Sequence, residues 1–340
     1  MFAARRSACS RANARCWSAA ISLLLLGGCD QLQSALNPQG PVSLAISRMW
    51  WIMFWGAVAI FVLVVVLMLY AVFSAPERRR PINATKMIIS GGVILPVVSL
   101  TALLVYGTQF LDEHIESVDG GESLKIEVIG SQWWWEIRYP QQGGDPPVVT
   151  AEEIYIPVGR AIDISVSTRD VIHSFWVPSL AGKIDLIPGK INRIALRADK
   201  SGIYRGQCAE FCGIQHARMG IFVFAVPPAE FEAWLDGQRR PATSEAVGIR
   251  AQGEAAFLTQ DCSRCHTIRG TAAAGKRGPD LTHVGSRQTL AAGTLPNNAA
   301  SLAAWISSNH EIKTGNKMTR YEHLDADTIA ALAAYLEGLK

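Results

Sequence analysis

The sequence carries little charge for its length. Charged residues make up 18% of its 340 residues and hydrophobic residues 49%, and the mean hydropathy of +0.17 is high for a soluble protein. The formal charge of +3 comes from the N-terminus, because removing Arg5, Arg6, Arg11 and Arg15 leaves slightly fewer basic than acidic residues. This nearly equal number of basic and acidic residues argues against nucleic acid as a partner. The high mean hydropathy predicts a membrane protein.

Two long stretches lack charged residues and histidine altogether. Residues 50–73 and 87–111 each exceed the about 20 residues that a membrane-spanning helix needs. Glycines and Pro96 interrupt the second stretch, which membrane helices tolerate. We therefore expect a transmembrane hairpin over residues 49–111, and the lack of histidine excludes haem ligation by imidazole within it.

The connection between the two stretches is basic. Residues 78–80 are all arginine and Lys86 follows, so the positive-inside rule predicts that this connection faces the cytoplasm. Both ends of the hairpin then face outward. The tryptophans within residues 50–55 are typical of an interfacial belt.

Residues 1–28 resemble a bacterial lipoprotein signal peptide. An apolar run follows the arginines and leads into Leu-Gly-Gly-Cys, so processing would leave a lipidated Cys29 as the first residue. The alternative is an ordinary secretory peptide that is cleaved elsewhere. Either peptide predicts that residues 29–48 form a periplasmic segment.

Cysteine is rare, and each cysteine needs a role. Cys9 and Cys16 belong to the leader, and Cys29 is the expected lipid attachment site. In an oxidising compartment the remaining cysteines would tend to pair unless they bind something. They are Cys208, Cys212, Cys262 and Cys265.

Soft metal ligands concentrate in CAEFCGIQHARM, residues 208–219. Thiolate and thioether suit copper and imidazole suits several metals, so Cys208, Cys212, His216 and Met219 favour copper. One alternative is a helix face packed in a core, which the neighbouring glycines disfavour. Another is a structural zinc ion, which would leave Met219 without a role.

A further histidine, His173, stands upstream in DVIHSFWVP. Two histidines, two cysteines and a methionine exceed the ligands of one tetrahedral ion, and both thiolates can bridge. The set therefore argues for two metal ions. An electron shared between two bridged ions would change bond lengths little, which favours fast electron transfer.

The segments DVIHSFWVPSL and GQCAEFCGIQHARM resemble subunit II of the haem-copper cytochrome c oxidases, and the resemblance extends over about residues 40–236. In that family they hold the dinuclear copper centre called CuA. The resemblance assigns its ligands to His173, Cys208, Cys212, His216, Met219 and the backbone carbonyl of Glu210. The Glu210 side chain matches the family's magnesium ligand at the border with the catalytic subunit.

Residues 112–236 are expected to form the copper domain. Short alternating runs from Ser123 onward predict a Greek-key sandwich or barrel, which the resemblance narrows to a cupredoxin fold. Trp133, Trp134 and Trp135 are expected in one strand, with the outer two on the same face. Core packing is one role for such a trio. The resemblance instead makes Trp133 the residue through which electrons reach CuA.

Residues 237–246 are polar and are expected to link to a second domain, residues 247–340. There Cys262, Cys265 and His266 form C-x-x-C-H, the attachment signature of c-type haem. A thioredoxin-like redox pair is the alternative. Met318 is the only methionine after the motif, and methionine–histidine ligation raises the haem potential, as an electron carrier requires.

Residues 247–340 resemble a class I cytochrome c. The expected fold is therefore a two-helix transmembrane hairpin, an all-β cupredoxin-like Greek-key sandwich and an all-α cytochrome domain. The two resemblances together imply subunit II of a bacterial caa-type oxidase in the cytoplasmic membrane, with both outer domains on the periplasmic face. They imply electron flow from haem c through CuA to subunit I, where oxygen is reduced to water with proton pumping. The implied partners are subunits I and III and an upstream cytochrome c or cytochrome bc complex.

Two other functions stay open. A quinol oxidase subunit lacks copper, and the complete set of soft ligands argues against it. A stand-alone membrane-anchored copper or haem redox protein, such as a sensor or a copper-delivery lipoprotein, would need one anchor and no two-helix hairpin.

Overall fold

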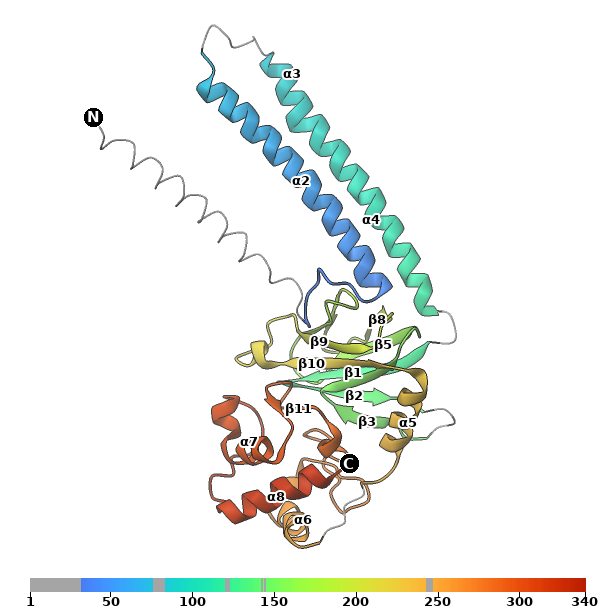
Figure 1. The fold of residues 1–340 in the computed structure, drawn as a ribbon, viewed down its shortest axis with the longest axis vertical. Coiled ribbons are helices and arrows are strands. Elements are labelled where there is room, and N and C mark those ends of the chain that lie inside the picture. Colours follow the sequence, from blue (N-terminus) through green and yellow to red (C-terminus); the bar gives the residue numbers. More distant parts are fainter. Residues whose placement is uncertain (1–31, 76–82, 120–122, 142, 144, 243–246) are drawn as a thin grey trace, which may run out of the picture.

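The computed structural model describes residues 32–75, 83–119, 123–141, 143, 145–242 and 247–340. Cys29, the leader and the arginines of residues 78–80 lie outside the described residues. Within the described part, a helical hairpin, a β-sandwich and a helical domain follow one another along the molecule (Figure 1).

The hairpin consists of α2 (Pro41–Phe73) and a second, compound helix. The second helix contains α3 (Ala84–Ile89), a π-helical turn over Ser90–Ile94 and α4 (Leu95–Asp119). The helix α2 begins well before the expected residue 50. Pro41 suits its first turn, where a missing N–H costs nothing, and the Ser43 hydroxyl accepts from the Gly40 N–H.

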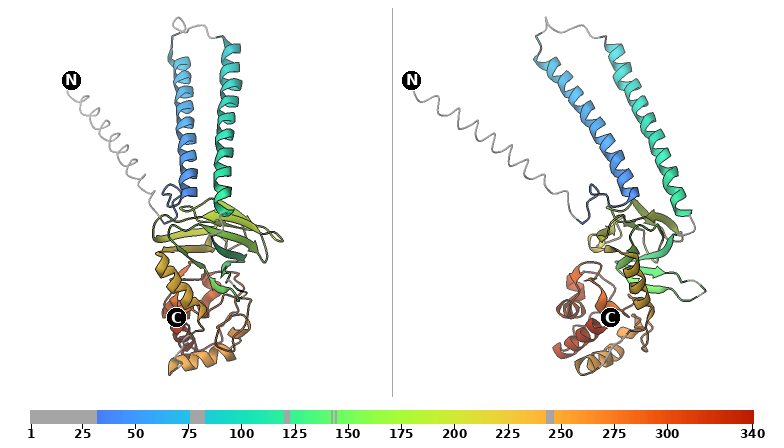
Figure 2. Two further views of the ribbon diagram at one scale, coloured as in Figure 1. Left: turned by 90° about the vertical axis from the view of Figure 1, so that its right-hand side faces the viewer. Right: turned by 45° about the vertical axis from the view of Figure 1, so that its right-hand side comes forward.

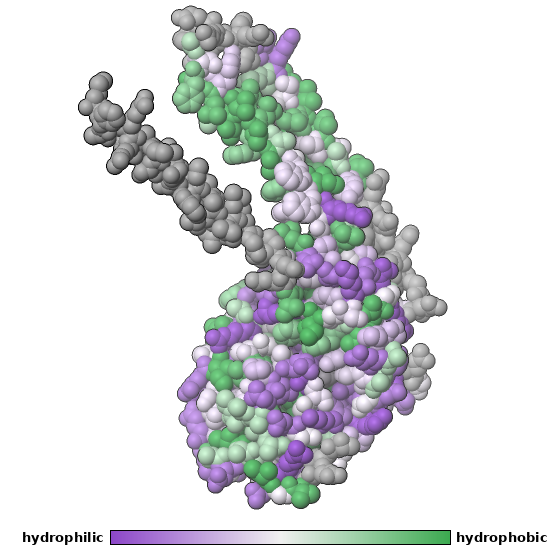
Figure 3. Space-filling view, viewed as in Figure 1, coloured by the Kyte–Doolittle hydropathy of each residue, from purple (hydrophilic) through white to green (hydrophobic). Residues whose placement is uncertain are grey.

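The hairpin exposes apolar side chains along both helices. Both are long and apolar enough to cross a membrane, and Figure 3 shows apolar residues over the visible face of the hairpin, in contrast to the mixed surface below it. Phe61 is 68% exposed and Leu100 65% exposed. Such a surface requires lipid or another protein around it.

The start of α2 is anchored to the sandwich. The Gln39 N–H donates to the Ser179 carbonyl at 2.8 Å, and the Ser43 hydroxyl donates to the same carbonyl at 2.8 Å. The Asp199 N–H returns a hydrogen bond to the Gln39 carbonyl at 2.9 Å. The two views of Figure 2 accordingly show the hairpin standing on the sandwich.

The sandwich has two five-stranded sheets, in the orders β3-β2-β1-β5-β8 and β4-β10-β9-β6-β7. The pairs β1/β5 and β4/β10 are parallel, and the other neighbours are antiparallel. The strands are β1 (Leu124–Ser131), β2 (Trp134–Tyr139), β3 (Val148–Ala151), β4 (Glu153–Pro157), β5 (Ile162–Thr168), β6 (His173–Trp176), β7 (Lys183–Leu186), β8 (Asn192–Leu196), β9 (Gly202–Cys208) and β10 (Gly220–Val226).

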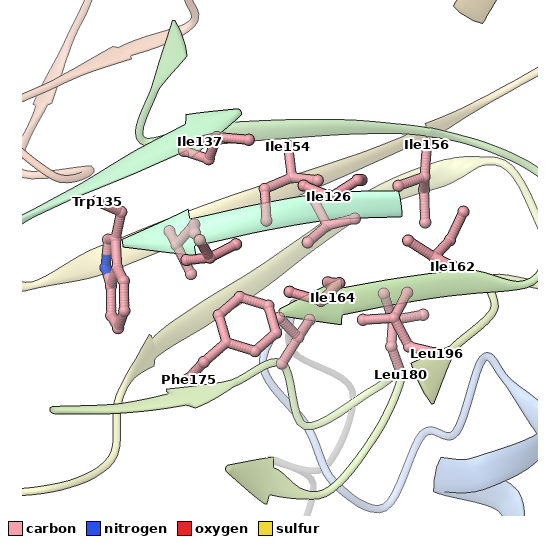
Figure 4. Close-up of a cluster of buried hydrophobic side chains, with 14 of the residues drawn as sticks. Ile126, Trp135, Ile137, Ile154, Ile156, Ile162, Ile164, Phe175, Leu180 and Leu196 are labelled. Carbon is pink, nitrogen blue, oxygen red and sulfur yellow. The ribbon is translucent and has the colours of Figure 1, made fainter. Parts of the chain in front are cut away.

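Alternating side chains of these strands fill the sandwich core. Ile126 of β1 and Ile164 of β5 are fully buried between the sheets, as their period of two predicts (Figure 4). Phe175 and Trp135 continue this core toward His173. The centroid of the Trp135 ring lies 6.2 Å from that of Phe175 and 6.1 Å from that of His173. Helix α5 (Pro228–Arg239) closes the domain by burying Phe231.

The expectation that all three tryptophans lie in one strand is wrong for Trp133. Ser131 pairs directly with Trp134 across β1 and β2, so Gln132 and Trp133 make the connecting turn. A two-residue connection is the commonest way to join antiparallel strands. The Trp133 side chain therefore leaves from the end of the sandwich, although it is as buried as a core residue.

The C-terminal domain is mainly helical and packs on itself through α6 (Ile249–Thr259) and α8 (Ala326–Gly338). Gly253 permits this approach, because an added Cβ would lie 2.0 Å from the Ala331 carbonyl oxygen. The remaining elements are the 3-10 turns Cys262–Arg264 and Val284–Ser286, the hairpin β11 (Thr289–Leu290) and β12 (Leu295–Pro296), and α7 (Ala299–Ile312).

Candidate copper and haem sites

The structure brings the expected copper ligands together at one end of the sandwich. His173 begins β6, Cys208 ends β9, and the loop from β9 to β10 supplies the others. Cys208 Sγ lies 3.6 Å from Cys212 Sγ and 3.9 Å from His173 Nδ1. Cys212 Sγ lies 3.8 Å from His216 Nδ1 and 3.9 Å from Met219 Sδ. The two sulfurs thus lie side by side, each with its own imidazole.

This donor set fits a pair of soft metal ions. The Cys212 thiol, His173 and backbone N–H groups lower the pKa of Cys208, whereas the neighbouring Cys208 raises the pKa of Cys212. The negative charge of one thiolate disfavours ionisation of the sulfur beside it, and a cation between the two would favour both thiolates. A dinuclear metal centre supplies such cations, and buried thiolate, thioether and imidazole ligands suit copper.

Asp170 orients one of the imidazoles. The His173 Nε2–H donates to Asp170 Oδ1 at 2.9 Å, which directs Nδ1 toward the sulfurs. Burial would raise the pKa of Asp170, but hydrogen bonds from His173, from the Gln132 N–H and from other donors lower it overall. Asp170 is therefore a carboxylate at neutral pH.

Glu210 contributes differently through its backbone and its side chain. Its carbonyl oxygen lies 3.2 Å from Cys208 Sγ, next to the expected metal ligands. Its carboxylate is 45% exposed, with Lys183 Nζ at 4.0 Å. The side chain is thus accessible to a partner outside this chain.

The cytochrome domain contains a cavity of about 700 Å³ that reaches the copper domain. Cys262, Cys265, His266 and Met318 all line it. The His266 Nδ1–H donates to the Pro279 carbonyl at 2.8 Å, so Nε2 remains as the ligand atom. Burial lowers the pKa of His266, which keeps the imidazole neutral as iron ligation requires. Gly278 lies so close to this ring that an added Cβ would be 2.5 Å from His266 Cε1.

Met318 is held at both of its backbone groups. Its N–H donates to Asn316 Oδ1 at 2.8 Å, and the His310 Nε2–H donates to its carbonyl at 2.8 Å. The His310 Nε2–H is thus engaged by the Met318 backbone, so His310 positions the methionine. Neither Asn316 nor His310 stands out in the sequence, because neither belongs to a motif.

The cavity fits a haem group in its chemistry as well as its size. Apolar side chains such as Phe257, Leu302 and Leu332 line it. Arg287 also lines it, and its buried Nε has no hydrogen-bond partner among the described residues. A guanidinium donor of this kind suits an anionic propionate of a porphyrin.

Trp133 connects the two sites. It lines the cavity, and its indole Nε1–H donates to the Cys212 carbonyl at 2.9 Å. The copper loop, which connects β9 to β10, packs on the indole at Gly213. Gly213 has a φ of +115°, and a Cβ added there would lie 2.9 Å from Trp133 Cζ2, so glycine allows the contact. One side chain thus lines the cavity and contacts Cys212, an expected copper ligand.

A buried lysine of the cytochrome domain holds Trp133 from the other side. Lys313 Nζ donates to the Trp133 carbonyl at 2.7 Å and to the Ala291 carbonyl at 3.2 Å. Burial lowers the pKa of Lys313 to about 8 and raises the pKa of Glu152 to about 7, and each charge opposes the other's shift. Glu153 adds a second link, because its Oε1 accepts from the Gln288 N–H at 2.7 Å.

Replacing Lys313 with methionine should weaken the contact between the two outer domains. The substitution removes the two hydrogen bonds of the Lys313 ammonium and leaves the Trp133 carbonyl without its lysine donor. The free energy of unfolding should fall by about 1.5–3 kcal/mol. Calorimetry of the detergent-solubilised protein should record a lower unfolding temperature. The exposed Lys190 is the matched control, and an equal decrease in Lys190→Met would contradict this interpretation.

Replacing Met318 with histidine should lower the haem reduction potential by on the order of 0.1 V, within the about 0.8 V that axial ligands span. Spectroelectrochemical titration measures this shift. The copper absorption should stay unchanged, because the copper ligands come from another domain. A joint loss of haem and copper signals would contradict the assignment of two separate sites.

Comparisons with known proteins agree with this division. A family model for the periplasmic domain of cytochrome c oxidase subunit II matches residues 147–226, and a model for cytochrome c matches residues 250–340. The fold and these matches define a membrane-anchored protein that joins a cupredoxin-like domain to a c-type cytochrome domain.

One relative matches over nearly the whole chain, and others match over parts of it. Cytochrome c oxidase subunit 2 of Alkalihalophilus pseudofirmus is 33% identical over 93% of this chain and 94% of that protein. The Bacillus subtilis protein of the same name is 31% identical over 73% of this chain and 70% of that protein. The solved periplasmic domain of subunit II from Bradyrhizobium japonicum is 35% identical over 34% of this chain and 93% of that one, with a TM-score of 0.31. The chain belongs to the cytochrome c oxidase subunit 2 family.

Proposed function

We propose that this subunit conducts electrons from a haem c on Cys262, Cys265, His266 and Met318 to a dinuclear CuA centre. Its ligands would be His173, Cys208, Cys212, His216, Met219 and the Glu210 carbonyl. Subunit I of the oxidase would receive the electrons and reduce oxygen to water with proton pumping. Subunit III would complete the complex in the bacterial cytoplasmic membrane, and an upstream cytochrome c or cytochrome bc complex would donate to it.

When bound, the haem and the copper pair supply one-electron exchange at little structural cost. The residues of this chain keep that cost low. The Asp170 carboxylate fixes the orientation of His173, and the Pro279 carbonyl fixes that of His266. Asn316 and His310 hold Met318 through its backbone. A rigid ligand set limits rearrangement when the charge of a site changes.

The observation that carries the proposal is the position of Trp133. This residue lies against the haem cavity while its indole N–H donates to the carbonyl of Cys212. The path between the sites therefore runs within one folded unit and needs no docking from solution. The exposed Glu210 carboxylate and the apolar hairpin supply the surfaces toward the other subunits, and Glu210 is the expected magnesium ligand there.

Purification from native membranes in mild detergent tests this proposal. A haem-copper catalytic subunit should copurify with the chain, and the complex should show mixed-valence copper absorption in the near infrared. It should also show sharp low-spin haem c bands on reduction. A stand-alone redox sensor or copper-delivery protein would elute without a catalytic subunit, and that result would overturn the proposal.

A further inference from the structure

An ion pair crosses from the cytochrome domain to the copper site. Lys317 Nζ lies 3.2 Å from Asp170 Oδ2, while the other oxygen of Asp170 accepts from His173 at 2.9 Å. The adjacent Arg169 pairs instead with Glu136, at 2.7 Å. The cation of the cytochrome domain is thus one carboxylate away from an expected copper ligand.

The backbone around Lys317 is fixed on the copper domain. The Gln215 side-chain amide donates to the Thr314 carbonyl at 2.7 Å, and Arg218 donates to the Ile312 carbonyl. Both donors come from the loop that carries His216 and Met219. Lys313 holds the same segment to Trp133. The segment 312–317 therefore bridges the copper loop, Trp133 and Asp170, and it runs directly into Met318.

We propose that Lys317 is a positioning residue through which the cytochrome domain raises the reduction potential of the copper centre. This inference rests on the proposed function, because it requires copper at His173. The hydrogen bond between Asp170 and His173 lies within the copper domain. The cytochrome domain contributes the positive charge of Lys317, which pairs with the Asp170 carboxylate.

Two physical effects act in the same direction. A cation beside Asp170 reduces the negative charge that the carboxylate presents to His173, so the imidazole donates less electron density to copper. The cation also directly favours the reduced centre, which carries less positive charge than the oxidised one. Removing Lys317 should therefore stabilise the oxidised copper pair and lower its potential.

The side chains of Lys317 and Asp170 are 61% and 21% exposed, so solvent and salt screen the interaction. Exposed ion pairs contribute little, and the expected change in the copper reduction equilibrium is about two- to fivefold. This change is small but measurable by redox titration against a fixed mediator.

The test titrates the copper absorption of the full-length protein and its Lys317→Met, Lys317→Arg and Arg320→Gln variants. Lys317→Met should lower the copper potential, and Lys317→Arg, which keeps the positive charge, should have the potential of the unmodified protein. Arg320→Gln should leave it unchanged, because it removes a cation of the same loop that pairs with Glu322. If Lys317→Met disturbs the neighbouring haem ligand, Lys317→Gln replaces it with the same expected result.

An unchanged copper potential in a variant with intact haem and copper bands would overturn the role of Lys317 and leave the proposed function standing. A decrease of the same size in Arg320→Gln would also overturn it, because any loss of charge would then suffice. Absence of mixed-valence copper absorption from the unmodified protein would overturn the proposed function and this inference together.

Discussion

Replacing Cys212 with serine should abolish the mixed-valence copper absorption and leave the haem bands in place. Cys212 Sγ lies within 4 Å of donor atoms of Cys208, His216 and Met219, so it is the expected ligand atom that lies nearest to the others. A hydroxyl does not replace a bridging thiolate, because it is a harder and far less acidic ligand. Copper content and near-infrared absorption of the purified variant measure the loss, which should be complete.

Phe211→Leu is the matched control for Cys212→Ser. Phe211 stands in the same loop and is 75% exposed. Its ring lies 5.9 Å from that of His216 but offers no donor atom, so its replacement removes no ligand. It should retain copper at the level of the unmodified protein. Persistent copper absorption in Cys212→Ser would contradict the dinuclear site, and loss of the haem bands would contradict the separate haem site.

Replacing Trp133 with leucine should slow electron transfer from the haem to copper by about tenfold or more, which corresponds to about 1.4 kcal/mol or more of barrier. The substitution removes the side chain that lines the haem cavity and the hydrogen bond to the Cys212 carbonyl. It also leaves a void against Gly213. Rapid photoreduction of the haem, followed by the rise of reduced copper, measures the rate.

Two further variants separate the causes of the Trp133 effect. Trp133→Phe keeps an aromatic ring but removes the N–H donor, so its rate should lie between those of the unmodified protein and Trp133→Leu. Trp134→Leu alters the neighbouring side chain, which lines the cavity and packs under Arg169, and it should change the rate little. Equal rates in Trp133→Leu and the unmodified protein would exclude Trp133 from the path.

The sequence predicts the hairpin, several strands and the two cysteine motifs, because each depends on residues that are close together in the chain. The apolar runs predict the hairpin, and alternation with a period of two predicts strands such as β1 and β5. Cys208 and Cys212, with a histidine and a methionine at short spacing, predict one soft-metal site because a single loop can bring them together. C-x-x-C-H works in the same way, since its two attachment cysteines and its ligand histidine lie close together in the chain.

The contacts between the two outer domains could not be predicted from the sequence. Lys313 and Trp133 are separated by 180 positions, and Lys317 and Asp170 by 147. A lysine in a polar loop ordinarily points into water, so only the docked structure shows that Lys313 is buried. The turn position of Trp133 depends on the register of β1 and β2, which alternation alone does not specify.

Metal analysis of the purified full-length chain, separated from the catalytic subunit, tests the central claim most directly when its near-infrared and visible spectra are recorded with it. We expect about two copper ions and one c-type haem iron for each copy of this chain, with mixed-valence copper absorption. Zinc at Cys208 and Cys212, or a chain without covalently bound haem, would contradict it.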